Sequence, residues 1–202
     1  MPEIRDPLYG DIFLSDIELR TLDTKEFQRL RWLYQLPLSY FVFPGATHTR
    51  FSHSIGVVEL ATRIAKSIKE EMEIRQEDID SLRIAALLHD IDEPPFYPVF
   101  KEKYPKRQYA LQNRKTIVER ICQQVSSKID CDTILSIMNG KDEYRFLGQI
   151  INSEVGANRI DYLLRDSFYC GVKYGNIDLR ILYEFEIKDR ELILKKEAIP
   201  LV

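Results

Sequence analysis

The chain has 202 residues, of which 45% are hydrophobic and 30% are charged, as is typical of a soluble globular domain with one sizeable core. Its 29 basic and 32 acidic residues leave a net charge of −3, which argues against an obligate polyanion binder because such domains present a clustered basic surface. The longest stretch without a charged residue, Trp32 to Thr49, contains two prolines and a glycine, which excludes a continuous apolar membrane helix.

The N-terminal segment and the cysteines favour a cytoplasmic protein. Residues 1–6 lack the basic and apolar regions of a secretory signal. Cys122, Cys131 and Cys170 have no CxxC spacing and are odd in number, so we expect reduced thiols instead of a disulfide framework.

A helix is predicted to begin near residue 15. Ser15-Asp16-Ile17-Glu18 has the form of a capping box, in which the Ser15 and Glu18 side chains satisfy free backbone N–H groups. Apolar residues then follow at roughly helical spacing up to Pro37, which cannot donate a backbone hydrogen bond: Leu22, Phe27, Leu30, Leu33 and Leu36. Segment 37–52 is expected to be irregular.

The next two predicted helices carry histidines on their apolar faces. From His53 onward, apolar residues recur every three or four positions, as in a helix that buries one face. A second such helix starts near Gln76 and reaches His89 and Asp90 before the break at Pro94-Pro95. The two histidines therefore face the core, and a His-Asp pair lies at the end of the second helix.

The remaining sequence predicts further helices over about 117–125, 131–138 and 143–165, the last bent at Gly156. Residues 183–194 alternate between apolar and polar around a turn, which predicts a hairpin that must pack on the helices or on another chain. The predicted fold class is all-α with a small C-terminal β-hairpin. We expect a helical core over 1–180 and a hairpin appendage over 181–202.

His53, His89 and Asp90 form a candidate metal site. Imidazole nitrogens and carboxylate oxygens suit Zn, Fe, Mn or Ni, and a helical bundle fixes their geometry. The alternative is that the buried histidines hydrogen-bond to the backbone, and spacing alone does not decide between the two.

Several long motifs occur in the order found in one enzyme family. The segments around the histidines, Thr47 to Val57 and Ala85 to Asp90, resemble the HD-domain phosphohydrolases, and most closely the branch of the dNTP triphosphohydrolases, of the dGTPase and sterile-alpha-motif/HD-domain type. The other matching motifs are Asp6-Pro7-Leu8-Tyr9-Gly10, Phe27-Gln28-Arg29-Leu30-Arg31, Gln35-Leu36, Tyr40, Phe43-Pro44-Gly45-Ala46 and Arg159 to Ser167. The resemblance runs from residue 4 to the end and implies a helical HD-domain bundle.

The resemblance implies that His53, His89 and Asp90 ligate one divalent ion, with Mn, Fe, Co, Ni, Zn and Mg as candidates. The family's fourth ligand, an aspartate, is replaced by Asn158. An amide oxygen can coordinate a hard cation but is neutral, so we expect the ion to be held weakly. Asp161 is the alternative fourth ligand, although it would need a local rearrangement.

A second departure follows the His-Asp pair, where the family has two catalytic-pocket histidines and this chain has Glu93 and Pro98. The first of those family histidines protonates the leaving group, and such general-acid help contributes ~10²–10⁴-fold in rate. Glu93 can replace it only if burial or a neighbouring carboxylate keeps it protonated near neutral pH. Glu93 and Asp90 are thus the candidate catalytic residues; the alternative for Glu93 is a solvated residue at a helix end.

The resemblance implies a nucleotide or another phosphate ester as substrate. It assigns sugar or phosphate contacts to Gln35, Arg50, Arg159, Tyr162 and Asp166. Each also has a structural alternative, such as a surface ion pair for Arg50 or a pair with Arg165 for Asp166. Because the fixed donor fork of arginine suits phosphate oxygens, Arg50 and Arg159 are favoured for phosphate. His48 is expected to be structural or to line the pocket.

A basic run lies between Pro98 and Lys115, where six basic residues accompany one acidic residue: Lys101, Lys103, Lys106, Arg107, Arg114 and Lys115. A solvated face is the expected role. The alternative is electrostatic steering of a triphosphate or of a nucleic-acid strand, which nothing else in the sequence indicates.

Two functions stay open. The first is a metal-dependent phosphohydrolase that releases triphosphate from a dNTP or phosphate from a nucleotide monoester. The alternative is a catalytically impaired relative that serves as a nucleotide-sensing or interaction module. It stays open because the substitutions affect the fourth metal ligand and the general acid, whereas the residues at the substrate-contact positions match the family. The resemblance also implies that the protein forms a homo-oligomer, namely a dimer. It further implies that family members continue beyond the segment that ends at Val202 here.

Overall fold

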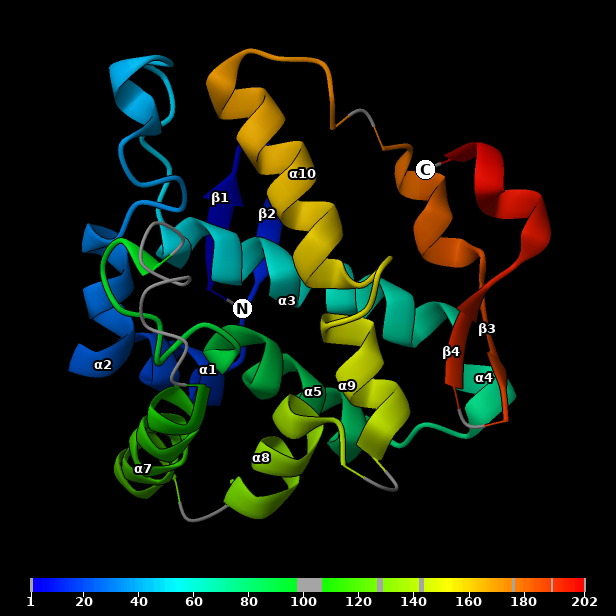
Figure 1. The fold of residues 1–202 in the computed structure, drawn as a ribbon. Coiled ribbons are helices and arrows are strands. Elements are labelled where there is room, and N and C mark those ends of the chain that lie inside the picture. Colours follow the sequence, from blue (N-terminus) through cyan, green and yellow to red (C-terminus); the bar gives the residue numbers. More distant parts are fainter. Residues whose placement is uncertain are drawn as a thin grey trace.

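The computed structural model describes residues 2–97, 107–126, 129–141, 144–175, 177–189 and 191–201. Its centre is α3 (Arg50–Ser67), which packs against both α5 (Gln76–Leu88) and α10 (Ala157–Cys170) (Figure 1). The apolar faces of α3 and α5 supply a large share of the core. Among the described residues no helix is long and apolar enough to cross a membrane. The predicted fold class, a mainly helical bundle with a C-terminal hairpin, is confirmed.

Shorter helices surround this centre. α8 packs on α5 and α9, and α7 packs on α8 and on α1. Their bounds are Asp16–Leu22 for α1, Lys25–Gln28 for α2, Lys69–Met72 for α4, Arg107–Val125 for α7, Cys131–Asn139 for α8 and Arg145–Ile151 for α9. Short 3-10 helices cover Arg29–Trp32, Ser39–Phe41, Leu179–Tyr183 and Lys196–Leu201.

The central helix α3 begins at Arg50, three residues earlier than the apolar spacing indicates. The Thr49 side chain accepts the backbone N–H of Ser52, and the Ser52 side chain accepts the N–H of Thr49 in return. This reciprocal cap satisfies two free donors and starts the helix. As a result Arg50 and His53 lie one turn apart on the same helix, so both side chains reach the same end of the core.

The first predicted helix is wrong in its length. It begins at Asp16 with the predicted capping box of Ser15 and Glu18, but it ends at Leu22. The Thr24 side chain accepts the N–H of Phe27 and so caps a new helix, α2. The apolar stripe therefore runs over two helices and a 3-10 turn, which the spacing of leucines alone cannot distinguish from one helix.

The predicted helix over 143–165 is also two helices, α9 and α10. Gly156 does not bend one helix but ends the turn that separates the two. A Cβ at Gly156 would lie 2.7 Å from both the Ile151 carbonyl oxygen and the Ser153 nitrogen. The turn is therefore too tight for any side chain at this position, and it brings Asn152, at the end of α9, close to Asn158 in the first turn of α10.

The predicted C-terminal hairpin is confirmed as β3 (Phe185–Lys188) paired antiparallel with β4 (Glu191–Leu194). Phe185 is buried, and the backbone N–H of Leu192 donates to Oε1 of Gln149 on α9 at 2.8 Å. The hairpin was expected to pack on the helices or on another chain, and the structure shows it packed on the helices of the same chain.

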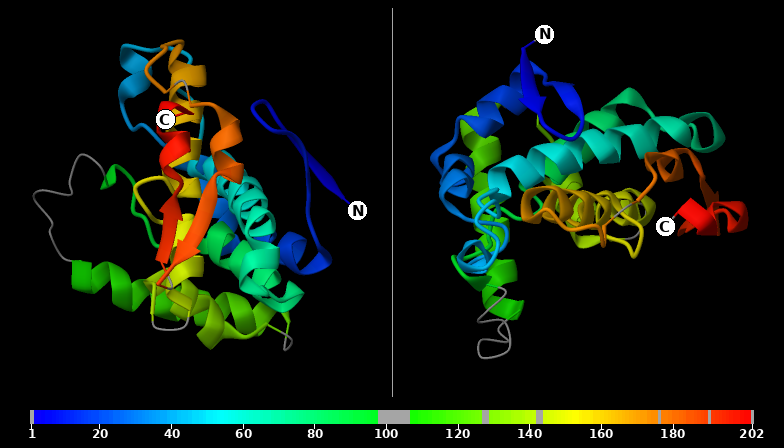
Figure 2. Two further views of the ribbon diagram at one scale, coloured as in Figure 1. Left: turned by 90° about the vertical axis from the view of Figure 1, so that its right-hand side faces the viewer. Right: turned by 90° about the horizontal axis from the view of Figure 1, so that it is seen from above.

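A second hairpin, β1 (Glu3–Asp6) with β2 (Gly10–Phe13), was not predicted. Its strands are too short to show alternation, and Gly10 adopts the left-handed conformation that closes the turn, with φ of 78°. Viewed from above, α3 lies between this hairpin and α10 (Figure 2).

Candidate metal centre

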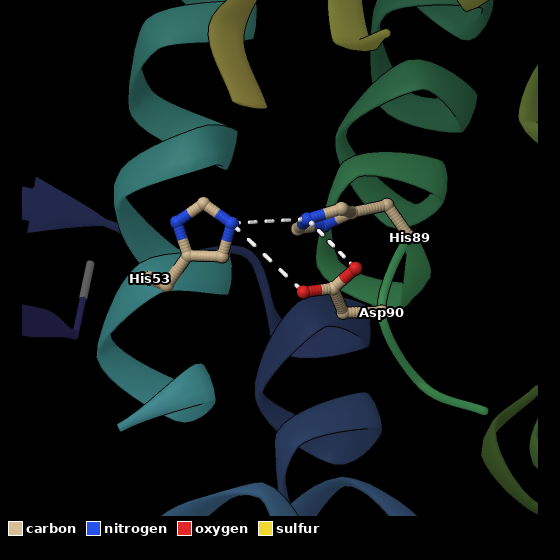
Figure 3. A group of neighbouring side chains, drawn as sticks. All are labelled: His53, His89 and Asp90. Carbon is tan, nitrogen blue, oxygen red and sulfur yellow. Dashed lines mark hydrogen bonds and ion pairs between the residues drawn. The ribbon is translucent and has the colours of Figure 1, made fainter. Parts of the chain in front are cut away.

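Three predicted ligands meet where α3 and the end of α5 come together (Figure 3). One ligand atom from each of His53, His89 and Asp90 lies within 4.8 Å of the other two. Nε2 of His53 is 3.3 Å from Nε2 of His89 and 3.9 Å from Oδ2 of Asp90. Both rings are buried. Helical periodicity and the His-Asp motif therefore lead to one compact group in space.

Hydrogen bonds on the far sides of the rings set their tautomers. Nδ1 of His53 lies 2.7 Å from Oδ2 of Asp161, and Nδ1 of His89 lies 2.8 Å from the carbonyl oxygen of Ala86. An ionised carboxylate and a carbonyl only accept, so each Nδ1 carries a proton and donates it. In the neutral rings both Nε2 lone pairs then point into the centre. Metal-ligating histidines are held in this same way.

Asn158 adds a fourth polar group to the centre. Its Oδ1 lies 3.1 Å from Nε2 of His53, and its Nδ2 donates to Oδ1 of Asn152 at 2.9 Å. The amide oxygen, not the amide NH₂, therefore faces Nε2 of His53. Asp161, the alternative fourth ligand, instead contacts the opposite side of His53.

The donor set fits a divalent cation. Nε2 of His53 faces Nε2 of His89, Oδ2 of Asp90 and Oδ1 of Asn158, and with both Nδ1 atoms protonated in neutral rings all four atoms are acceptors. Acceptors that face one another without a hydrogen between them repel, and a cation between them removes that repulsion. Mixed nitrogen and oxygen donors suit Zn, Mn, Fe, Co and Ni. Only Asp90 is formally charged, so the four groups together contribute a charge of −1.

A buried ion cluster orients His53 through its Nδ1 atom, on the side away from the candidate metal centre. Arg165 donates from Nε and Nη2 to the two oxygens of Asp161, each at 2.9 Å, and from Nη1 to Asp6 at 2.9 Å. Burial alone would raise the pKa of Asp161, but the hydrogen bond from His53 and the charge of Arg165 lower it. Asp161 therefore stays an acceptor and keeps the Nδ1 proton on His53.

This cluster passes across α3 at Gly56. A Cβ there would lie 2.0 Å from Oδ1 of Asp161 and 2.3 Å from Nη2 of Arg165. The absence of a side chain opens the path that joins α10 to Asp6 on the N-terminal hairpin. This cluster was not predicted from the sequence, where its only local signal is the i,i+4 spacing of Asp161 and Arg165.

Arg50 connects the centre to Glu93. Its Nη1 donates to Oδ2 of Asp90 at 2.5 Å, and its Nη2 is 3.8 Å from Oε2 of Glu93. Burial alone would raise the pKa of Asp90, but the His89 ring and the Arg50 guanidinium hold it well below its usual range. Glu93 is different: burial, together with the negative charge of Asp90, raises its pKa to about 7.

The backbone after the His-Asp pair is held by Arg29. Its guanidinium donates to the carbonyl oxygens of Ile91 and Glu93 at 2.8 and 2.9 Å. Asp92 pairs with Arg114 at 2.8 Å. Pro98 and three of the six basic residues of the run, Lys101, Lys103 and Lys106, lie outside the described residues.

The predicted substrate residues are placed differently from one another. Gln35 and Asp166 are linked through His48: the Gln35 N–H donates to the His48 carbonyl at 3.0 Å, and Nε2 of His48 lies 2.7 Å from Oδ1 of Asp166. Asp166 therefore pairs with His48, not with Arg165. Arg159 is exposed and pairs with Glu154, and Tyr162 is partly buried.

Comparison with known proteins matches the HD domain over residues 50–166, which hold His53, the His89-Asp90 pair and Asn158. The chain belongs to the HD domain family. An uncharacterized protein of Methanocaldococcus jannaschii is 40% identical over 183 residues, covering 90% of this chain and 37% of that protein. The deoxynucleoside triphosphate triphosphohydrolase SAMHD1 of Gallus gallus is 30% identical, covering 92% of this chain and 36% of the relative.

Two solved structures share this HD-domain fold. A hypothetical protein from Aquifex aeolicus superposes with a TM-score of 0.85 and 33% identity, covering 98% of this chain and 55% of that one. A phosphohydrolase from Bacteroides thetaiotaomicron superposes with a TM-score of 0.88 and 29% identity, covering 99% and 50%. The chain thus spans between about a third and about half of the length of these relatives.

Proposed function

We propose that this HD-domain chain is a metal-dependent phosphohydrolase that acts on a nucleotide. The observation that carries the proposal is the centre in which Nε2 of His53 faces Nε2 of His89, a carboxylate oxygen of Asp90 and the amide oxygen of Asn158. A relative named as a deoxynucleoside triphosphate triphosphohydrolase and a structural neighbour named as a phosphohydrolase support this reading.

In this proposal the four residues hold one divalent ion. A bound divalent cation supplies Lewis acidity, which activates water and neutralises charge on a phosphate oxygen. His53 is kept in the ligating tautomer by Asp161, and His89 by the Ala86 carbonyl. Asp90 provides the negative charge of the site.

Glu93 is proposed as the general acid that replaces the family histidine. Its side chain is largely buried beside Arg50, and its Oε2 has no hydrogen-bond partner among the described residues. The carboxyl would give its proton to the oxygen of the leaving group. Arg50 lies between Asp90 and Glu93, where its guanidinium donors would also bind a phosphate oxygen.

Gln35 and Asp166 are proposed to contact the sugar. Oε1 of Gln35 is buried without a hydrogen-bond partner in the described part of the chain, as expected for a group that a ligand satisfies. Arg159 and Tyr162 are proposed for the phosphates and for stacking. The substrate class is a dNTP or a nucleotide monoester. A homodimer and a cytoplasmic location remain proposals based on the family resemblance.

A nucleotide-sensing or interaction module is the second candidate. The Arg50–Asp90 ion pair favours it, because Arg50 already neutralises the carboxylate oxygen that an ion would use. The neutral Asn158 favours it further, since the centre lacks the second negative charge that the family supplies.

The test is to measure product release from dNTPs, NTPs and phosphomonoesters with Mn, Fe, Co, Mg or Zn added, against an Asp90→Ala control. The enzyme proposal predicts metal-dependent release well above that of the variant. Release equal to that of the variant would contradict it. Nucleotide binding without release would then favour the sensing module.

A further inference from the structure

The orientation of Asn158 depends on a residue outside the metal centre. Asn158 lies in the first turn of α10, and its Nδ2 donates to Oδ1 of Asn152, six residues earlier, at 2.9 Å. Its own Oδ1 is then left facing Nε2 of His53 at 3.1 Å. Asn152 is exposed and touches neither histidine in this arrangement.

This hydrogen bond matters because the two ends of an amide have opposite character. Rotation of the amide by half a turn would place the NH₂ group toward Nε2 of His53, whose lone pair accepts such a donor. That orientation is favourable without a cation, and it would turn two donor hydrogens toward an incoming ion. A partner that accepts a hydrogen bond from the outer end of the amide is therefore needed to keep the oxygen inward.

Asn152 is built to be such a partner. Its backbone N–H donates to the Gly148 carbonyl at 2.8 Å, which ties it to the end of α9. The turn that follows closes tightly at Gly156, where no side chain fits. With the backbone placed in this way, Oδ1 of Asn152 lies 2.9 Å from Nδ2 of Asn158. An aspartate at position 158 would not need this help, because both of its carboxylate oxygens are acceptors.

We propose that Asn152 is a positioning residue for the metal centre: it fixes the Asn158 amide so that the oxygen, not the NH₂ group, ligates a divalent cation. The inference rests on the proposed metal site and deepens it. It explains how this chain can use a neutral amide where its family uses a carboxylate.

The experiment is a set of Mn²⁺ titrations by calorimetry on the full chain. The variants are Asn152→Ala, Asn152→Asp, Asn158→Asp and the Asn152→Ala/Asn158→Asp double substitution. Asn139→Ala is the control for replacing an exposed asparagine, and His53→Ala is the reference for binding outside the metal site. Circular dichroism checks that each variant is folded. Asn152 is exposed, so its replacement should leave the fold intact.

Loss of an outer partner typically weakens metal binding ~10–100-fold, and we expect about ten-fold for Asn152→Ala. Asn152→Asp keeps an acceptor and should restore the affinity, whereas Asn139→Ala should change nothing. In the Asn158→Asp background, Asn152→Ala should have no effect, because an aspartate at position 158 presents an acceptor oxygen in either orientation.

Two results would overturn the inference, and they differ. If Asn152→Ala binds Mn²⁺ as tightly as the parent chain while His53→Ala binds less, the metal site stands and the positioning role is wrong. If the parent chain binds no more tightly than His53→Ala, the metal site itself fails, and the role of Asn152 fails with it.

Discussion

Asp161 accepts a hydrogen bond from Nδ1 of His53, with an N–O distance of 2.7 Å. It also accepts two hydrogen bonds from Arg165. The carboxylate thus connects the metal centre to a buried ion cluster that also includes Asp6 of β1. The orientation of His53, a candidate metal ligand, and the cohesion of the fold depend on the same side chain.

Replacing Asp161 by Asn should therefore lower both stability and metal affinity. The change leaves Arg165 buried with one carboxylate instead of two, and breaking a buried ion pair costs about 3 to 5 kcal/mol in the free energy of unfolding. Chemical denaturation measures this cost. Asp11→Asn, in the exposed pair with Arg5, is the matched control and should change little. Equal effects of the two substitutions would show that the buried cluster does not stabilise the fold.

Gly56→Ala should be strongly destabilising for a steric reason. Its methyl group would overlap both Asp161 and Arg165, and overpacking of this kind costs about 1 to 3 kcal/mol or more. Gly10→Ala is the comparison, because it has open space and only a left-handed backbone to strain, which costs about 1 kcal/mol. Melting curves that rank Gly10→Ala as the more damaging change would contradict the proposed packing.

The stability of the metal-free protein should depend on the protonation of Glu93. Its pKa is raised to about 7 from the usual 4.5, so the folded state binds this proton more tightly than the unfolded chain. The resulting contribution is complete below the unfolded pKa and is lost as the pH rises toward about 7, up to about 3 kcal/mol in total.

Glu93→Gln removes this titration, so relative to the parent the variant should gain stability as the pH rises from about 5 to about 8. Denaturant titrations in the presence of a chelator measure the difference at each pH. Glu197→Gln, at an exposed position, should give a flat difference. A flat difference for Glu93→Gln as well would mean that its environment is not the one described.

His48→Phe should weaken nucleotide binding without weakening metal binding. Phenylalanine can keep the stacking on Tyr169, whose ring centroid is 4.7 Å from that of His48, but it cannot pair with Asp166. A buried carboxylate without its partner costs about 1 to 3 kcal/mol, and Asp166 would no longer be held toward a sugar. Titrations with a dNTP and with Mn²⁺ separate the two effects. Loss of Mn²⁺ affinity in the variant would count against independent roles for these groups.

Much of the site could be predicted because short-range patterns determine it. Helical spacing placed His53 and His89 on inward faces, and the structure has both rings buried with their Nε2 atoms 3.3 Å apart. The capping box at Ser15 and the alternation in the C-terminal hairpin are local signals of the same kind.

The parts that could not be predicted depend on contacts between distant segments. Asp6 and Arg165 are 159 residues apart, and nothing local to either one indicates the pair. The break at Gly156 depends on a backbone clash that is visible only in three dimensions. The amide orientation of Asn158 depends in turn on that break, because it brings Asn152 within reach.

The proposed metal centre places one divalent ion among four acceptors at the ends of α3, α5 and α10. The most direct measurement is the metal content of the purified chain after loading with Mn²⁺ and removal of free ion, by mass spectrometry, for the parent and for a His53→Ala/His89→Ala double variant. We expect about one ion per folded parent chain and almost none for the variant. A parent chain with no more metal than the folded variant would contradict this expectation.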